Sequence, residues 1–195
     1  MTNTPKQEIW LQFLVNISKF VDRRVSKSGK HSAKVAEWAS TTARELKMSE
    51  NEVDNVYWAS ILHDIGKIGI SERVLRKKSI LSEEDWVLIK MHPTIGSNIV
   101  SSIDAYPSLA TTISAHQEKY DGTGYPKGLS GKNIPLGARI LGIADAYQAM
   151  VEHRYYREAR TPAEAVTELQ KVKGTQFDPD VLDVFLNVVN SETAI

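Results

Sequence analysis

The chain has 195 residues, a length that suits one domain with a sizeable core. Its 24 basic and 24 acidic side chains balance, so no overall field would gather nucleic acid or a membrane surface. Because cysteine is absent, disulfides, thiolate nucleophiles and Cys-ligated zinc are excluded. No stretch resembles a signal peptide or approaches the ~20 apolar residues of a membrane span, so we expect a cytoplasmic protein that neither binds DNA nor inserts into membranes.

Apolar residues recur with a helical period along most of the chain. We predict helices over residues 7–24, 30–47, 82–92, 107–118, 136–150, 162–173 and 178–190, a further helix that includes the amphipathic run 52–62, and a short turn over 71–75. Ser49 and Glu52 form a capping-box pattern that opens the third helix, which we expect to end near Gly66. Pro93 is expected to end or kink the helix that opens at Ser82, with a helical continuation beyond it.

Residues 121–135 form a long irregular segment, with four glycines and two prolines among fifteen residues. A structureless loop of that length inside a compact domain is usually functional or disordered. No period-2 strand, internal repeat or interdomain linker stands out elsewhere. The sequence therefore predicts an all-α, single-domain helical bundle with one long Gly/Pro-rich loop.

The chemistry of the chain centres on the stretch His63-Asp64-Ile65-Gly66-Lys67. It follows an amphipathic run, so it places an imidazole, a carboxylate and an ammonium at one helix terminus. A neutral imidazole offers one lone pair to a metal, and a carboxylate has two oxygens that can bridge two metals. Protonated Lys67 cannot bind a metal, but it could meet a phosphate drawn to such metals.

Three further histidines lie at predicted helix junctions, whereas His153 lies in a charged and aromatic run that we expect at the surface. The three are His31, His92 and His116. Taken singly, such histidines are more often exposed or satisfied by one core hydrogen bond. Asp145 favours the metal interpretation, because a carboxylate on the apolar face of a helix is costly unless it is paired or bound to metal. We expect Asp145 to point inward with the histidines.

Short motifs follow one another in a set order over roughly residues 25–185. They are HSAKVA at 31–36, HDIGKIGI at 63–70, KMHPTIG at 90–96, HQEKYDGTGYP at 116–126, ARI at 138–140 with ADA at 144–146, RYYR at 154–157 and GTQFDP at 174–179. This series resembles the HD-GYP phosphodiesterases, a branch of the HD-domain metal-dependent phosphohydrolases. The resemblance implies an all-α catalytic domain that opens cyclic di-GMP to linear pGpG and further to GMP.

The resemblance also implies a binuclear metal site. Carried over position by position, one metal is held by His31, His63, Asp64 and Asp145, and a second by Asp64 as the bridge with His92 and His116. Nitrogen and carboxylate donors suit iron, manganese or zinc, and the ligand set does not choose among them. A metal-activated hydroxide is then expected to attack the phosphorus.

Three cations match the phosphate-contacting positions of the family, and they are Lys67, Arg154 and Arg157. Lys67 is expected to be catalytic as well, since a cation at the reacting phosphate stabilises its developing charge. For the two arginines, a solvated helix end is an equally open interpretation.

The name-giving segment of the family matches the loop, through Asp121, Gly122, Gly124, Tyr125 and Pro126. Its glycines allow tight turns and close approach to a ligand, and the proline stiffens the exit. The resemblance implies that this loop shapes the site and offers a surface to protein partners, without a catalytic role. A structural loop packed by its own side chains is the alternative.

The chain departs from the family pattern at several positions. Gln117 stands where many members have a second histidine that binds the second metal, so we expect that site to be weaker. Lys27 stands where members with a third metal have a glutamate, so we expect two metals at most. Residues unusual for the family at 148, 152, 153 and 155 are expected to affect the grip on substrate.

We expect two regions, an N-terminal helix over 1–24, of the kind that joins a sensory domain in relatives, and a catalytic region over 25–195. Two alternatives to cyclic di-GMP hydrolysis stay open. One is hydrolysis of another cyclic dinucleotide, and the other is a weakly active or inactive module that acts by binding protein partners. A homodimer, the identity of the metals and the final product are also left open by the sequence.

Overall fold

The computed structural model describes residues 5–26, 28–102, 107–153 and 158–193. Within these residues the chain forms α-helices joined by turns and two short 3₁₀ helices, and it contains no strand; Lys173 and Phe177 form an isolated bridge. The elements are α1 Pro5–Val25, α2 His31–Glu45, α3 Glu50–Leu62, η1 Ile65–Gly69, α4 Glu72–Leu75, α5 Glu83–Lys90, α6 His92–Ser101, α7 Pro107–Ala115, η2 Gly131–Asn133, α8 Leu136–Val151, α9 Pro162–Lys171 and α10 Pro179–Thr193. The prediction of an all-α bundle is confirmed.

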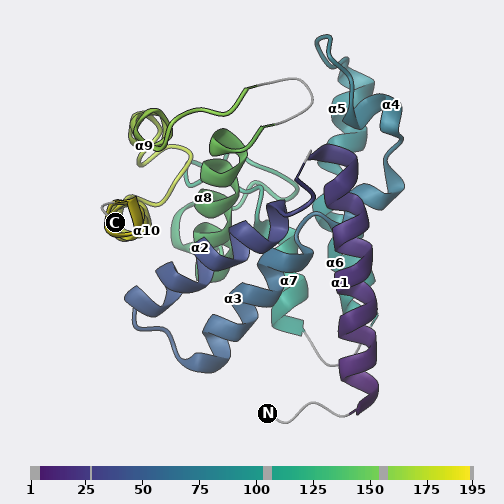
Figure 1. Cartoon of the computed structure of the whole chain (residues 1–195), viewed down its shortest axis with the longest axis horizontal. Coiled ribbons are helices and arrows are strands. Elements are labelled where there is room, and N and C mark those ends of the chain that lie inside the picture. Colours follow the sequence, from purple (N-terminus) through teal and green to yellow (C-terminus); the bar gives the residue numbers. More distant parts are fainter. Residues whose placement is uncertain (1–4, 27, 103–106, 154–157, 194–195) are drawn as a thin grey trace.

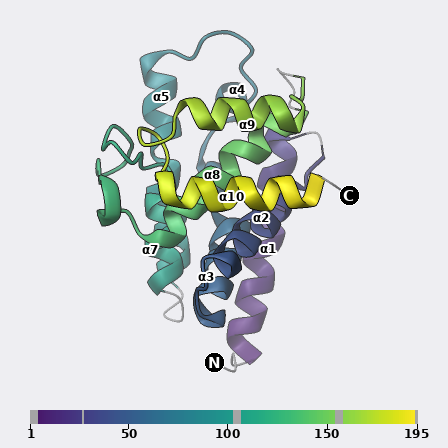
Figure 2. The same ribbon diagram turned by 90° about the vertical axis from the view of Figure 1, so that its left-hand side faces the viewer.

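The bundle is built around α2, α3 and α8, with α1 along one side (Figure 1). Helices α9 and α10 run side by side across the face formed by α8 and α2 (Figure 2). The main core lies between these layers, where Tyr147 and Phe185 pack edge to face with ring centroids 5.4 Å apart. Within the described part of the chain, no helix is long and apolar enough to cross a membrane.

Helix α1 is amphipathic, as its apolar period predicts, but it uses only part of its apolar surface. Leu14 and Val21 are buried, whereas Phe13 and Phe20 are 52% and 58% exposed. The buried side of the helix also carries Asp22, whose carboxylate accepts hydrogen bonds from the backbone N–H and hydroxyl of Ser32. Because Ser32 lies in the first turn of α2, α1 fixes the point at which that helix begins.

The third helix begins as predicted, with Ser49 donating to the Glu52 carboxylate. The expectation that it ends near Gly66 is wrong, because α3 ends at Leu62 and the chain turns into η1. At Gly66 the chain packs closely on α6, since a Cβ built on this glycine would lie 2.0 Å from the carbonyl oxygen of His92. The 3₁₀ turn therefore presses this glycine against the backbone of α6.

The other helix boundaries follow the sequence closely. Pro93 does not kink a continuous helix; α5 ends at Lys90 and α6 begins at His92, with the proline in a first turn that needs no N–H donor. Helix α7 ends at Ala115, three residues before the predicted end at residue 118. The long loop is irregular as predicted, except for η2, and it is anchored by the Glu118 carboxylate, which accepts from the backbone of residues 127 and 129.

Candidate metal centre

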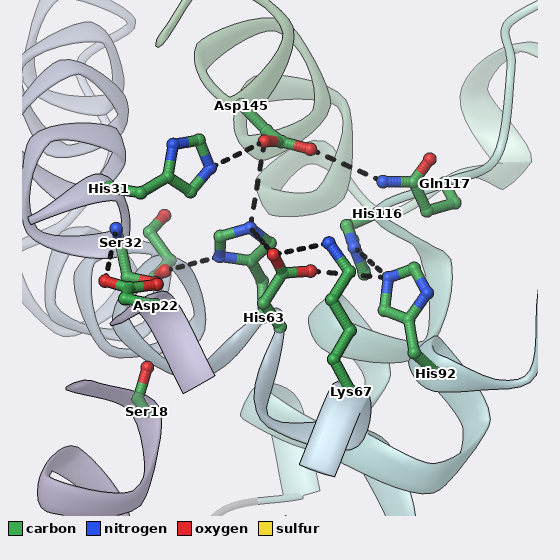
Figure 3. Close-up of polar contacts among 12 residues, drawn as sticks. Ser18, Asp22, His31, Ser32, His63, Lys67, His92, His116, Gln117 and Asp145 are labelled. Carbon is green, nitrogen blue, oxygen red and sulfur yellow. Dashed lines mark hydrogen bonds and ion pairs between the residues drawn. The ribbon is translucent and has the colours of Figure 1, made fainter. Parts of the chain in front are cut away.

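Six side chains that the sequence singled out meet at the middle of the bundle (Figure 3). They come from different elements: His31 begins α2, His63 and Asp64 follow α3, His92 begins α6, His116 follows α7, and Asp145 lies on α8. All but Asp145 are buried, and the side chain of Asp145 is 19% exposed. Helix ends therefore supply five of the six positions, and a helix interior supplies the sixth.

These side chains form two groups of three, in each of which the potential ligand atoms lie within 4.8 Å of one another. In the first group, Oδ1 of Asp145 lies 3.0 Å from His31 Nε2 and 3.8 Å from His63 Nε2. In the second, His92 Nε2 lies 3.2 Å from His116 Nε2 and 3.5 Å from Asp64 Oδ1. Each group has the size and donor types of a site that could hold one metal ion.

Asp64 connects the two groups. Its Oδ2 lies 3.5 Å from His63 Nε2, while its Oδ1 lies at the same distance from His92 Nε2. Among the described side chains, His63 Nε2 and Asp64 Oδ1 are buried without a hydrogen-bond partner. Buried polar atoms are rarely left unsatisfied, so these two atoms fit a centre whose ligands are completed by metal ions.

Three of the histidines are oriented by backbone carbonyls at the ends of helices. Nδ1 of His63, His92 and His116 donates to the carbonyl oxygen three residues earlier, over 2.8, 2.7 and 2.7 Å. A ring that donates from Nδ1 keeps its lone pair on Nε2, and Nε2 is the atom that faces the centre in each case.

His31 is oriented by a side chain instead. Its Nδ1 lies 3.0 Å from Oε2 of Glu152, and the other carboxylate oxygen accepts from the hydroxyls of Ser26 and Ser28. Burial alone would raise the pKa of Glu152, but the hydrogen bonds from His31, Ser26 and Ser28 lower it to about 2. Glu152 is thus a buried carboxylate that orients a candidate ligand, and its place directly after α8, seven residues beyond Asp145, is the sequence signal for it.

The protonation states suit metal binding. Burial lowers the pKa of His92 to about 3, with the ammonium of Lys67 acting in the same direction. Burial likewise lowers the pKa of His116 to about 4. At Asp64 burial favours the neutral acid, but Lys67 and the nearby histidines outweigh it and hold the pKa well below its usual range. Neutral imidazoles and an ionised carboxylate are the ligand forms of these groups.

Lys67 lies at the partly exposed edge of the centre. Its Nζ is 2.6 Å from Asp64 Oδ2, and its side chain is 18% exposed. Since Asp145 is also partly exposed, both Lys67 and Asp145 reach solvent at the centre.

Gln117 lies beside Asp145. Its Nε2 donates to Asp145 Oδ2 over 3.4 Å, and its Oε1 accepts from the hydroxyl of Tyr125 over 3.3 Å. Both polar ends of the amide are therefore engaged with protein groups.

The loop reaches the centre through Tyr125, whose ring centroid lies 6.4 Å from that of His92. Asp121 stays outside, where its carboxylate accepts from the backbone and hydroxyl of Thr123. Gly122 adopts a positive φ of 83° that favours glycine, and Pro126 is exposed. His153 is exposed as expected, and its Nδ1 lies 2.9 Å from Glu158. Lys27, Arg154, Tyr155 and Arg157 lie outside the described residues.

Comparison with known proteins places the chain in a class. The HD domain family model matches residues 16–181, and the chain belongs to this family. Its curated relatives confirm the resemblance to the HD-GYP phosphodiesterases. A cyclic di-GMP phosphodiesterase of Thermotoga maritima is 33% identical over 98% of this chain and 53% of its own length. A cyclic di-GMP phosphodiesterase response regulator of Xanthomonas campestris pv. campestris is 36% identical over 89% of this chain and 46% of its own.

A third relative is named for a different substrate. The 3′3′-cGAMP-specific phosphodiesterase 3 of Vibrio cholerae is 32% identical over 95% of this chain and 41% of its own length. The chain thus spans about half the length of the curated relatives it matches.

Solved structures share the fold. A cyclic GMP-AMP specific phosphodiesterase of Vibrio cholerae superposes with a TM-score of 0.72 at 20% identity, covering 94% of this chain and 49% of that one. An HD-GYP-type protein of Bdellovibrio bacteriovorus superposes with a TM-score of 0.69 at 22% identity, covering 82% and 51%. At these identities the likeness concerns the fold alone.

Proposed function

We propose that this chain is a metal-dependent phosphodiesterase that opens cyclic di-GMP to linear pGpG and, in a second step, to GMP. The observation that carries the proposal is the pair of ligand groups joined by Asp64, in a family whose curated relatives are named as cyclic dinucleotide phosphodiesterases. The two unsatisfied atoms, His63 Nε2 and Asp64 Oδ1, support metal binding independently of the relatives.

The proposed centre holds two divalent ions. His31, His63, Asp64 and Asp145 would bind the first, and Asp64, His92 and His116 the second. Iron, manganese and zinc all suit these nitrogen and oxygen donors. When bound, such ions lower the pKa of water and withdraw charge from a phosphate. The chain's own contribution includes neutral imidazoles at His92 and His116 and an ionised carboxylate at Asp64, because burial lowers the pKa of both histidines and Lys67 helps hold the pKa of Asp64 low.

Lys67 is the proposed catalytic cation. Its ammonium is held at the open edge of the centre by Asp64, where a phosphate that approaches the metals would meet it. There it would stabilise the charge that develops on the phosphate oxygens. Arg154 and Arg157 are proposed as further phosphate contacts on the strength of their motif alone.

A cavity next to Glu152, the residue that orients His31, offers room for a nucleotide. Its volume is about 560 Å³, and it is lined by Ser28, Lys30, Lys34, Gln148, Val151, Glu152 and His153. Glu152 lies between this cavity and His31 of the first ligand group. The two lysines of the cavity favour an anionic ligand, as a cyclic dinucleotide is. We propose the catalytic region at residues 25–195, with the loop around Tyr125 as a surface for protein partners; a homodimer fits the same proposal.

Another cyclic dinucleotide is the second candidate, because a relative with similar identity is named as specific for 3′3′-cGAMP. The test is metal analysis of protein purified without air, followed by turnover of cyclic di-GMP and 3′3′-cGAMP side by side. We expect up to two metal ions per chain and faster hydrolysis of cyclic di-GMP. Faster hydrolysis of 3′3′-cGAMP would make that dinucleotide the proposed substrate instead of cyclic di-GMP. A metal-loaded protein that hydrolyses neither would favour the protein-binding alternative.

A further inference from the structure

Gln117 is held between the loop and the first ligand group. An ionised carboxylate only accepts hydrogen bonds, so the group that Gln117 turns toward Asp145 must be its NH₂. The amide oxygen then faces the other way, where the Tyr125 hydroxyl donates to it. The chemistry of the two neighbours therefore fixes which way the amide points, and Figure 3 shows Gln117 directed at the outer oxygen of Asp145.

Asp145 needs such a partner. Its Oδ1 is turned toward His31 and His63, the other members of the first group. Its Oδ2 points away from them and meets Gln117 at 3.4 Å. The final torsion of an aspartate side chain is broad, so a contact to one oxygen decides where the other oxygen points. Gln117 is in the position to keep Oδ1 aimed at the first group.

Tyr125 is itself held firmly enough to orient Gln117. Its backbone N–H donates to the carbonyl oxygen of Gln117 over 3.2 Å, so backbone and side chain both join the two residues. The Lys90 ammonium lies 5.9 Å from the centroid of its ring. Just before it, Gly124 packs so closely that a Cβ would lie 2.3 Å from the backbone nitrogen of Lys119.

We propose that Gln117 is a positioning residue for Asp145 and that Tyr125 positions Gln117, so that the Gly-Tyr-Pro loop controls the geometry of the first metal group. The inference rests on the proposed metal centre. It differs from the expectation drawn from the sequence, in which position 117 concerns the second metal. A ligand role and a positioning role at this residue predict opposite responses to the same substitutions.

The test disables one ligand group at a time by mutation and measures how tightly the other group binds Co²⁺, without substrate. His92→Ala leaves the first group intact, and His31→Ala leaves the second. In the His92→Ala background, Gln117→Leu should weaken Co²⁺ binding about tenfold or more and alter the visible cobalt spectrum, as loss of an outer hydrogen bond does. Tyr125→Phe should weaken it less, and should add little once Gln117→Leu is present. In the His31→Ala background both substitutions should leave Co²⁺ affinity unchanged.

Gln117→Glu gives the sharpest contrast. If Gln117 orients Asp145, a second carboxylate repels it and weakens Co²⁺ binding in the His92→Ala background. If instead the side chain is a ligand of the second metal, the carboxylate should tighten binding in the His31→Ala background, and that result overturns the inference. Should a background variant misfold, the two phases of Co²⁺ titration in the otherwise unaltered chain give the same answer, because only one phase should respond to Gln117→Leu.

The outcomes also distinguish failure of this inference from failure of the proposed metal-dependent function. If the parent chain binds Co²⁺ and no substitution at position 117 or 125 changes the affinity, the positioning role is refuted but the metal centre is not. A parent chain that binds no Co²⁺ would refute both. With metal loaded, Tyr125→Phe should lower kcat for cyclic di-GMP while KM stays near its parent value, because the hydroxyl serves the centre and not the binding of the substrate.

Discussion

At the scale of single residues, Asp64 is the side chain on which both ligand groups depend. Its two oxygens face different histidines, so Asp64→Ala should remove both metals and abolish phosphodiesterase activity. We expect the helical fold to survive, as judged by far-UV circular dichroism, because the surrounding core is apolar. Asp180→Ala, which removes an exposed carboxylate on α10, is the matched control. Full activity of Asp64→Ala would refute the shared centre.

Lys67 should affect chemistry more than metal content. Lys67→Met keeps the length of the side chain but removes its charge, and we expect turnover to fall by about 10- to 1000-fold, as for the loss of a charge partner in a transition state. Metal analysis of the purified variant is the companion measurement. If metal and activity disappear together, Lys67 serves mainly to hold Asp64 in place, since their charged groups lie 2.6 Å apart.

Glu152 should affect metal binding, although it is not a candidate ligand and acts only by orienting His31. Glu152→Ala removes the acceptor for His31 Nδ1, and loss of such a partner costs about 10- to 100-fold in metal affinity. Glu152→Gln should be milder, because its amide oxygen can still accept from the ring. His153→Ala, one residue further and exposed, should leave metal affinity as it is in the parent. Equal affinities for Glu152→Ala and the parent would refute this role.

The six candidate ligands were predicted through the resemblance of the motifs to the HD-GYP family, with which the histidines at helix junctions and Asp145 on an apolar face agreed. The sequence did not predict Asp22 or the orienting role of Glu152, since these depend on how α1 and the end of α8 pack against α2. The orientation of the Gln117 amide could not be predicted from the sequence for a similar reason. A motif places a residue beside a centre, but only the neighbouring carboxylate decides which way its amide turns.

At the scale of elements, η1 must lie against α6 for the two ligand groups to meet. A Cβ on Gly66 would lie 2.0 Å from the carbonyl oxygen of His92 and 2.6 Å from the backbone nitrogen of Gly96, and neither backbone atom can rotate away. Gly66→Ala should therefore destabilise the fold by about 1–3 kcal/mol or more, as overpacking does, and should reduce metal content. Gly69→Ala is the control within the same element, because its nearest contact would be an ordinary 3.7 Å. Thermal melting of the two variants compares them, and equal melting temperatures would contradict the packing argument.

Most helices could be predicted from apolar periodicity and capping patterns, and the loop from its glycines and prolines. The errors fall at helix ends, one of them beside a long-range contact. The third helix was expected to continue to Gly66, but it ends at Leu62, and the chain passes into η1, whose Gly66 packs on the backbone of α6. Such contacts join segments about thirty residues apart, and local propensity does not contain them.

At the scale of the whole molecule, the candidate centre joins parts of the chain from His31 to Asp145. Ions that bind only the folded state stabilise it by about 2.7 kcal/mol at a concentration of 100 times Kd. Removal of metal with a chelator should therefore lower Tm by about 5–10 °C for each ion lost from a chain of this size. Asp64→Ala should melt at one temperature with or without chelator. An unchanged Tm in the parent after verified metal loss would show that the centre adds nothing to the fold.

The way the rings are oriented gives the centre an uneven resistance to mutation. At His63, His92 and His116 the tautomer is set by main-chain oxygens, which remain whichever side chains stand at positions 60, 89 and 113. Random substitution at those positions cannot delete the acceptor. The Nδ1 atom of His31 differs, because its acceptor belongs to the side chain of Glu152 and can be lost by substitution. A single nucleotide change in that codon can remove it, so the orientation of His31 is more sensitive to substitution than the orientation of the other three rings.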